Sequence, residues 1–369
     1  MRTEQIGTAE ATFLVFAMLS AKIFLTLPRY MMEDAQTAAW LLVLLSGAAG
    51  ALGWSALVLF MRRFPGRSLI QAVEETLGPY LALPIQLLYM SFFVIVSAVV
   101  LRQFAEAILT VVLPLTPISV IASTLMAAAA YASYLGVEAV ARAARFFIPI
   151  TVALVLLLLL LILPTSARLT ETLPLLGPGI GPLLKWALIR SSLFIDVLLL
   201  PVLLPSLKEP EKMARIGYNA ILWTILFWTL VVLVFQMSFP YPAGAANPFP
   251  LLAIARLINI GRFLQRVEAF FIFAWVFAAA AKIAAALLGA VISYAETFHL
   301  RIYRPLVIPL ALLILAVSFI PRDFYLAMTW DRAFLRVYGA IPVFILPLIL
   351  WGIALIRRKG GKRDAQQKG

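Results

Sequence analysis

The sequence predicts an all-α integral membrane protein of about ten transmembrane helices in a single domain. Hydrophobic residues make up 63% of the 369 residues and charged residues only 13%, and the mean hydropathy is +1.01. Apolar runs of about 20 residues, the length that crosses a bilayer as a helix, recur along the whole chain. A soluble domain needs a larger share of polar surface, so the sequence leaves no room for a separate one.

Apolar runs and the Pro, Gly or polar residues between them place five spans in residues 8–163 and five in residues 183–356. The expected spans are 8–28, 37–61, 83–110, 117–135, 145–163, 183–204, 216–238, 266–292, 303–320 and 337–356. Residues 1–360 form one membrane domain, and 361–369 are predicted to be a disordered polar tail. The first run carries Lys22 and lacks a clear cleavage site, which favours a helix over a signal peptide.

The positive charges predict the orientation. With ten spans both termini lie on one side, and seventeen of the 30 Lys and Arg residues fall on that side against eight on the other. Cytoplasmic loops carry the excess of Lys and Arg, so both termini are predicted to be cytoplasmic. The net charge of +13 therefore indicates anionic lipid as the partner rather than nucleic acid.

Two connections show amphipathic helical spacing. Residues Arg67 to Tyr80, after the second span, alternate apolar and charged positions as a short helix on the inner surface would. Residues Asn247 to Phe263, before the eighth span, have the same character on the outer side.

The residue inventory excludes most catalytic chemistry. Cysteine is absent and His299 is the only histidine, which removes disulfides, thiolate nucleophiles, zinc sites and the HExxH motif. We expect no enzyme, no metal and no cofactor.

Ionisable residues inside the spans are the strongest functional signal, because each costs at least about 2.5–3.5 kcal/mol at the bilayer centre and needs a partner or a wet cavity. Lys22, Asp196 and Lys282 lie near the middle of the first, sixth and eighth spans. Two cations and one carboxylate suit a polar cavity, and the alternative is a set of helix-to-helix salt bridges without a ligand.

The other charges have simpler interpretations. Arg102 and Glu106 are four residues apart on one helix face and are expected to pair. Lys185 and Arg190 lie near the outer end of the sixth span, where they are expected to extend to the membrane surface.

The two halves of the chain share a positional pattern without sequence identity. The first span ends IFLTLP and the sixth contains FIDVLLLPVLLP, so each is an apolar helix interrupted by an ionisable residue and then proline. Paired irregular helices of this kind mark the binding site in transporters built from inverted repeats.

Several stretches resemble the GerAB-type spore germination permeases. The resemblance covers nearly the whole chain and is most specific in the segment before and within the eighth span, and in the LP-x-TP stretch after the third. The segments are NPFPLLAIARLINIGRFLQRVEAFFIFAWVFAAAAKI (247–283), LRQFAEAILTVVLPLTPISVI (101–121), LGVEAVARAARFFIPI (135–150) and LPRYMMEDAQTAAWL (27–41).

The resemblance implies a LeuT-like arrangement of five plus five inverted helices, as in the amino acid, polyamine and organocation transporter superfamily. It also implies a B subunit of a germinant receptor, in the inner membrane of the bacterial spore beside A and C subunits. A small germinant, often an amino acid, would bind between the first, third, sixth and eighth helices and trigger germination without any chemical bond being made. The candidate binding residues are Ser20, Ala21, Lys22, Phe24, Phe194, Asp196, Phe273 and Lys282. The candidate ion-pair or gating residues are Arg102, Glu106, Arg266 and Glu268.

The sequence departs from the superfamily at the first helix. Glycines are usual in its unwound part, whereas this chain has Ser20-Ala21-Lys22-Ile23. Ala and Ile resist unusual backbone angles, which argues against a fully unwound site and against recognition by exposed backbone groups.

Three functions remain open. The first is a receptor subunit that senses a nutrient, with Lys22 or Lys282 holding positive charge where a sodium-coupled relative binds its cation. The second is a proton-coupled amino-acid permease that uses Lys22 or Asp196. The third is a scaffold with a vestigial pocket that holds the other subunits.

Overall fold

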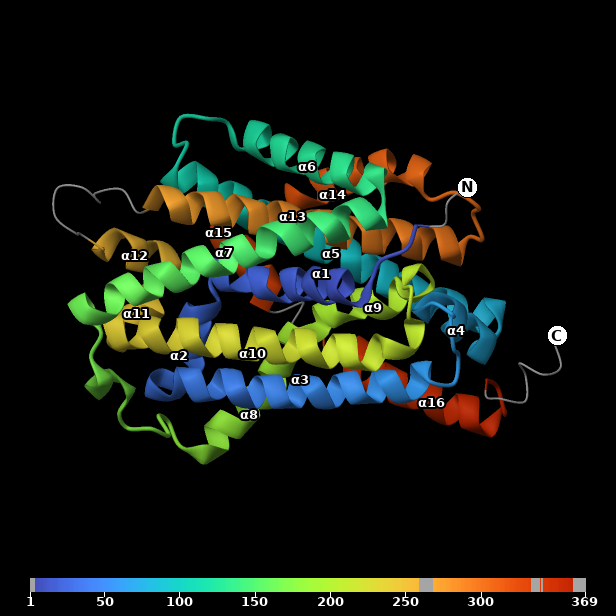
Figure 1. Cartoon of the computed structure of the whole chain (residues 1–369), viewed down its shortest axis with the longest axis horizontal. Helices are drawn as coiled ribbons and strands as arrows, with labels where there is room; N and C mark the ends of the chain where they lie inside the picture. The colour runs from blue at the N-terminus through green and yellow to red at the C-terminus, as the bar shows by residue number, and fades with distance from the viewer. Residues whose placement is uncertain (1–3, 259–267, 333–338, 340, 361–369) are drawn as a thin grey trace.

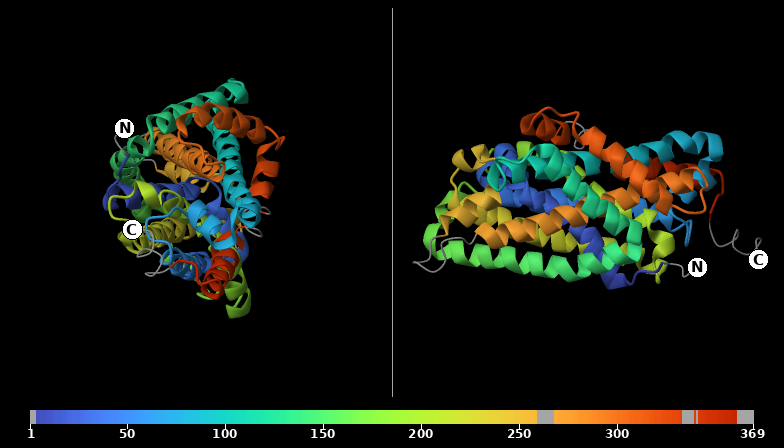
Figure 2. Two further views of the ribbon diagram at one scale, coloured as in Figure 1. Left: turned by 90° about the vertical axis from the view of Figure 1, so that its right-hand side faces the viewer. Right: turned by 90° about the horizontal axis from the view of Figure 1, so that it is seen from above.

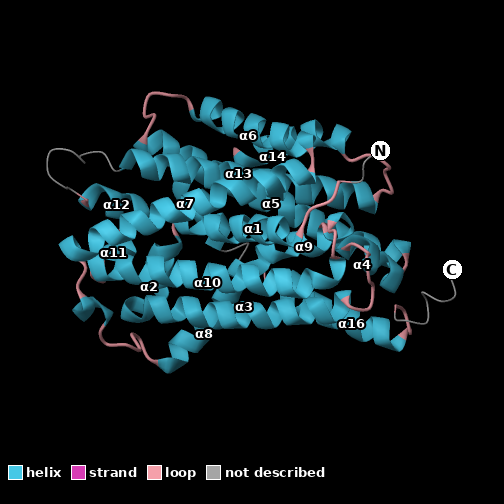
Figure 3. Cartoon of the chain, in the orientation of Figure 1, coloured by secondary structure: helices cyan, strands magenta, loops and turns pink. Residues whose placement is uncertain are grey.

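The computed structural model describes residues 4–258, 268–332, 339 and 341–360, and it is a bundle of helices with no strand among these residues (Figures 1 and 3). Six helical segments of the described chain are long and apolar enough to cross a membrane. Together with the composition, they make this an integral membrane protein. The long helices are α3 (Ala39–Met61), α5 (Pro79–Val111), α6 (Ile118–Leu135), α7 (Val137–Ser166), α10 (Met213–Ser238) and α13 (Glu268–Thr297). Shorter apolar helices are α14 (Val307–Ser318) and α16 (Leu346–Ile356).

Most expected spans agree with these helices at their ends, and the fifth does not. That span was expected from residue 145, but α7 begins at Val137. Its first two turns, Val137 to Ala144, carry charges that an apolar-run criterion skips, and Gly136 (φ +108°) separates them from α6. Glycine adopts this backbone angle at low cost, so it can end one helix directly before the next begins.

The first span is two helices and not one. α1 (Thr8–Ser20) passes into a 3-10 turn, Ala21–Phe24, and a second helix, α2 (Leu27–Ala35), follows after two irregular residues. Pro28 lies in the first turn of α2, where its missing N–H costs nothing.

The sixth span is interrupted in the same way. α8 (Ile180–Arg190) continues as a 3-10 segment, Ser191–Leu198, before the single turn α9 (Leu199–Val202). Both interruptions fall where the sequence pattern placed them.

The break in the first helix forms without glycine. Leu25 has φ −100° and ψ −124°, and Thr26 has φ −101° and ψ 5°. Both keep a negative φ, so the break needs no residue in the left-handed region, although the ψ of Leu25 lies outside the α and β regions. A short 3-10 turn is therefore enough to interrupt this helix without glycine.

α1 lies in the interior of the bundle, between α7, α10 and α13 (Figure 1). Ala17, Met18 and Leu19 are completely buried. Close packing elsewhere in the bundle depends on small residues. A Cβ at Gly50 of α3 would lie 2.7 Å from the Phe194 ring. The 3-10 segment of the sixth span therefore packs directly on the backbone of α3.

Short helices cover both ends of the bundle. α4 (Leu69–Leu77) confirms the amphipathic helix expected after the second span: Ser68 caps it and its apolar side is buried. At the other end lie α11 (Ala243–Ala246), α12 (Pro250–Leu257) and α15 (Phe324–Trp330). α12 is the described part of the second amphipathic connection, and residues 259–267 lie outside the described part of the chain.

Both ends of the described chain lie at the same end of the bundle (Figures 1 and 2). There the Glu4 carboxylate accepts hydrogen bonds from Val137 N (2.8 Å), Tyr303 Oη (2.8 Å) and Arg304 Nη2 (2.6 Å). Burial, reinforced by Glu4, raises the pKa of Tyr303 to about 12, so its hydroxyl remains a donor. The segment before α1 is thereby fastened to α7 and to the start of α14.

The loop before α10 adds a second contact to this end of the chain. Glu209 accepts hydrogen bonds from Lys212 and from Thr8 Oγ1 (2.7 Å). The hydrogen bond from Lys212 and, to a smaller extent, that from Thr8 hold the pKa of the Glu209 carboxyl below its usual value.

Candidate functional site

Three ionisable side chains from three different helices meet inside the bundle. The Asp196 Oδ2 atom lies 3.0 Å from Lys22 Nζ and 2.5 Å from Lys282 Nζ. Asp196 and Lys282 are buried, whereas the Lys22 side chain retains 14% of its exposure. The sequence expectation that the first, sixth and eighth helices bring these residues together agrees with this geometry.

The two lysines also bind backbone oxygens at the interrupted helices. Lys22 Nζ donates to Leu193 O (2.5 Å), within the 3-10 segment of the sixth span. Lys282 Nζ donates to Met18 O (2.6 Å), in the last turn of α1. Carbonyls in the last turn of a helix can lack their intrahelical donor, and the Lys282 ammonium donates to one of them, Met18 O. Exposed backbone at the breaks is therefore used within the protein.

The cluster of Lys22, Asp196 and Lys282 carries a surplus positive charge. Two ammonium groups face one carboxylate, and an ammonium offers three donors, of which Lys22 uses two here. A charge at membrane depth is expensive unless water or an opposite charge lies beside it, and the Asp331 carboxylate lines the cavity that the exposed part of Lys22 faces. The side chains at this cavity are therefore of both signs.

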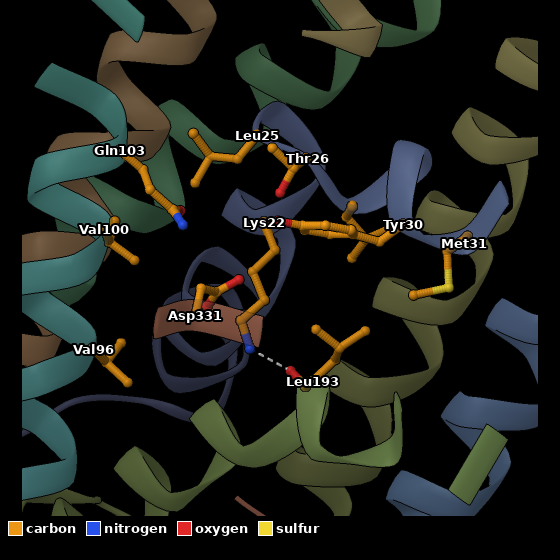
Figure 4. A pocket seen from close by; sticks show the side chains of 11 residues that line it. Lys22, Leu25, Thr26, Tyr30, Met31, Val96, Val100, Gln103, Leu193 and Asp331 are labelled. Carbon is orange, nitrogen blue, oxygen red and sulfur yellow. Dashed lines mark hydrogen bonds between the residues drawn. The ribbon is translucent and has the colours of Figure 1, made fainter. Parts of the chain in front are cut away.

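The cavity beside Lys22 has a volume of about 20 Å³, which holds about one water molecule. Pockets for small organic ligands measure about 300–1,000 Å³, so this conformation is closed around the site. Its walls come from the first-helix break, α2, α5 and the sixth-helix segment (Figure 4). The lining residues are Lys22, Leu25, Thr26, Leu27, Tyr30, Met31, Val96, Val100, Gln103, Leu193 and Asp331.

The remaining predicted binding residues lie elsewhere. Ser20, Ala21 and Phe24 are buried around the first-helix break but do not line the cavity. Phe194 is buried against Trp228, with ring centroids 5.3 Å apart. These side chains form the packing behind the charged cluster.

Phe273 was expected to line the site, and that expectation is wrong. It is 54% exposed on α13 and contacts Phe277, with ring centroids 4.6 Å apart. Lys282 lies on the inward face of α13, and Phe273 lies on an exposed face of the same helix.

Arg102 and Glu106 lie within hydrogen-bonding distance, with 2.6 Å between Arg102 Nη2 and Glu106 Oε1. Arg102 Nη2 also donates to Arg322 O at 2.9 Å. Of the other two candidate gating residues, Arg266 lies outside the described residues. Glu268 is the first residue of α13, and its side chain is also outside the described part.

The position of Arg190 in the sequence indicated that its side chain extends to the membrane surface, and this prediction is wrong. It is completely buried and paired with Asp34 of α2. The guanidinium carbon lies 5.4 Å from the centroid of the Tyr30 ring and 5.5 Å from that of Trp186. A planar guanidinium stacks on aromatic rings and pairs with a carboxylate at the same time, which makes burial possible.

Arg332 extends this pairing to a third element, after α15. Its guanidinium lies 3.0 Å from Glu33 Oε2 and 3.6 Å from Asp34 Oδ1, and 5.5 Å from the Tyr30 ring centroid. Tyr30 also lines the cavity. The charged pairs thus join α2, α8 and the segment after α15 beside the cavity.

Sequence reasoning missed four of the polar residues that line this cavity: Thr26, Tyr30, Gln103 and Asp331. One signal was available on α5, where Val96, Val100 and Gln103 are spaced four and three residues apart on one helix face. A glutamine in an otherwise apolar stripe marks a polar contact. Asp331 carried no comparable signal, because it lies far in the sequence from the other residues that line the cavity.

No group of three His, Asp or Glu side chains in the described ranges is arranged to hold a metal ion. The cavity is lined by the charged side chains of Lys22 and Asp331, by the polar side chains of Thr26, Tyr30 and Gln103, and otherwise by apolar residues. Such a site suits a small charged or zwitterionic molecule.

Comparison with solved structures identifies the fold. The transporter Mhp1 of the nucleobase-cation-symport-1 family, in a closed conformation with bromovinylhydantoin bound, superposes with a TM-score of 0.74 at 16% identity, over 96% of this chain and 80% of that chain. MhsT in complex with L-phenylalanine superposes with a TM-score of 0.59 at 15% identity, over 94% and 97% of the two chains. The chain has the fold of LeuT-type transporters.

Relatives by sequence are germination proteins of Bacillus subtilis (strain 168). Spore germination protein KB is 27% identical over 336 residues, covering 90% of this chain and 89% of the relative. Spore germination protein YndE is 24% identical over 371 residues, covering 98% and 99%. The family model described as "Spore germination protein" matches residues 5–323. This family is one of permease-like membrane proteins and not of enzymes. The chain belongs to the spore germination protein family.

Proposed function

We propose that this protein is the membrane subunit of a spore germinant receptor that binds a small zwitterion, an amino acid or a similar nutrient, in the cavity beside Lys22. The observation that carries the proposal is that side chains of opposite charge, Lys22 and Asp331, line one cavity bordered by two interrupted helices. Lys22 is suited to a ligand carboxylate. The Asp331 carboxylate on the same cavity is suited to a ligand ammonium.

The closed cavity supplies the signal in this proposal. About 20 Å³ is too small for an amino acid, so binding requires the helices around the cavity to separate. The ion pairs of Asp34, Arg190 and Arg332 hold α2, α8 and the segment after α15 together in the closed form. A ligand that binds only the opened form shifts the population toward it.

The wider setting belongs to the same proposal. The relatives, which are spore germination proteins, support a role in spore germination. We place the protein in the inner membrane of the spore, with A and C receptor subunits as partners. The positive-charge bias supports a cytoplasmic position for both termini. The partner subunits would convert the helix movement into germination.

Binding to the purified full chain tests the proposal. Isothermal titration over the common amino acids should find at least one ligand, and Lys22→Met should weaken it by about 10–100-fold, since a charged hydrogen bond contributes about 1.5–3 kcal/mol. Lys185→Met, which removes an exposed lysine of α8, is the matched control and should bind normally. Equal affinity of the wild type and Lys22→Met would remove Lys22 from recognition.

A proton-coupled amino-acid permease is the second candidate, and the buried cluster on a transporter fold favours it. A proton leaving one lysine would convert the cluster to a neutral pair. Proteoliposomes separate the two functions: saturable, pH-gradient-driven uptake of a labelled amino acid by the isolated protein supports the permease. Binding without uptake supports the receptor, and the absence of both supports a scaffold.

A further inference from the structure

Gln103 of α5 is a buried polar side chain that the charged cluster does not use. The residue is 2% exposed and lines the cavity opposite Lys22. Figure 4 shows its amide pointing from α5 into the space beside Leu25 and Thr26. The amide nitrogen has no hydrogen-bond partner in the described part of the chain.

Two other buried glutamines donate their amide hydrogens to backbone oxygens, although the Oε1 atom of Gln236 has no partner in the described part of the chain. Gln86, on the same helix, donates to Ile70 O at 3.1 Å. Gln236 donates to Thr37 O at 2.6 Å and to Glu171 O at 3.0 Å. A buried donor without a partner costs stability, because it has lost its hydrogen bonds to water. Gln103 departs from this pattern at the one wall where a ligand can supply the missing partner.

The rest of the α5 wall is apolar. Val96 and Val100 precede Gln103 on the same helix face. A ligand held at its charged ends by Lys22 and Asp331 therefore presents its side chain to a wall with two valines and one amide. An apolar wall discriminates weakly between ligands of equal shape, whereas a buried amide rejects a ligand that leaves it unpaired.

We propose that Gln103 is a specificity-determining residue, and that it selects ligands whose side chain carries a neutral hydrogen-bonding group over aliphatic ligands of the same shape. The substrate class is a small amino acid with a hydroxyl or amide side chain. This inference rests on the proposed function, because it assumes a zwitterion in the cavity. It adds the contact that chooses among zwitterions.

The test compares ligands matched in shape, threonine with valine and asparagine with leucine, by titration of the purified full chain. In the wild type the polar member of a pair should bind about 10-fold more tightly or better, because a ligand that leaves a buried donor unpaired loses a hydrogen bond that the polar ligand makes. Gln103→Met keeps the length of the side chain and removes the amide, and it should reduce the ratio to about one. Ser97→Ala is the control, because Ser97 is a buried polar residue of α5 that does not line the cavity.

A second measurement does not depend on a ligand. Gln103→Met removes an unpaired buried amide, so the ligand-free variant should unfold at the same temperature as the wild type or higher. A lower unfolding temperature contradicts the assignment of an unpaired amide.

The outcomes separate this inference from the function beneath it. Ratios near one in the wild type, an unchanged ratio in Gln103→Met, or binding confined to aliphatic or charged amino acids overturns the role of Gln103 and leaves the receptor function standing. No binding of any amino acid by the wild type overturns both.

Discussion

Removing the charge of Asp196 should destabilise this protein more than removing a lysine beside it. Asp196→Asn leaves the ammonium groups of Lys22 and Lys282 without their shared counter-charge, at side chains that are 14% and 1% exposed. Removing one partner of a buried ion pair costs about 3–5 kcal/mol. Lys282→Met leaves the remaining pair, 3.0 Å apart, electrically neutral, and costs about 1–3 kcal/mol for the donor that Met18 O loses.

The double variant Asp196→Asn/Lys282→Met measures the interaction. It leaves one buried ammonium instead of two, so its loss should be smaller than the sum of the single losses by at least about 1 kcal/mol, as expected for residues in contact. For a chain of this length 1 kcal/mol corresponds to about 1.3 °C in unfolding temperature, which predicts a fall of about 4–6 °C for Asp196→Asn.

Thermal unfolding in detergent, followed by the fluorescence of the eight tryptophans, is the assay. Glu211→Gln, at an exposed carboxylate, controls for the loss of a negative charge and should unfold like the wild type. An unchanged unfolding temperature for Asp196→Asn, or strictly additive losses in the double variant, would show that the lysines do not depend on Asp196.

Three further predictions concern other parts of the molecule. Arg190→Lys should lower stability by about 1–3 kcal/mol, because the ammonium keeps the charge beside Asp34 but loses guanidinium donors and the stacking on Tyr30 and Trp186. Thermal unfolding in detergent measures the loss, and a variant as stable as the wild type would contradict the pairing. Gly50→Ala should cost about 1–3 kcal/mol through overpacking against Phe194, and a Phe194→Leu background should relieve part of that loss. The pKa of the Glu209 carboxyl is lowered on folding, so its contribution to stability is present above the pKa of the unfolded chain and is lost as the pH falls through the pKa of the folded protein. Glu209→Gln should make the stability less dependent on pH in the acid range, and an unchanged dependence on pH would refute the contact.

Composition and apolar periodicity were enough to predict the membrane class, the long helices and the amphipathic helix α4. These features depend on residues adjacent in the chain, since a run of about 20 apolar residues has few alternatives to a membrane helix. The two interrupted spans were also readable, because an ionisable residue followed by proline is a local signal. The form of the break was not, since a 3-10 turn without glycine leaves no mark in the sequence.

The candidate site divides in the same way. Lys22, Asp196 and Lys282 were predictable because a charge at membrane depth is rare and needs a partner. Asp331 was not, since charges near span ends are common in membrane proteins, and Gln103 was marked only by its place in the apolar stripe of α5. The prediction for Arg190 was wrong because its position near the end of the sixth span favoured a side chain that reaches the membrane surface. Its burial is explained only by the position of Asp34 on another helix.

The sequence by itself determined that this chain crosses a membrane and which helices are interrupted. It also determined that the amines of Lys22 and Lys282 and the carboxylate of Asp196 need to pair inside the bundle. Each of these follows from the cost of exposing a polar group to hydrocarbon, which acts on every residue wherever the chain folds. Tertiary structure alone decided which side chains line the cavity, that Phe273 faces outward and that Gln103 faces inward. Those facts depend on the rotation of each helix about its axis, which is set by packing against neighbours distant in sequence.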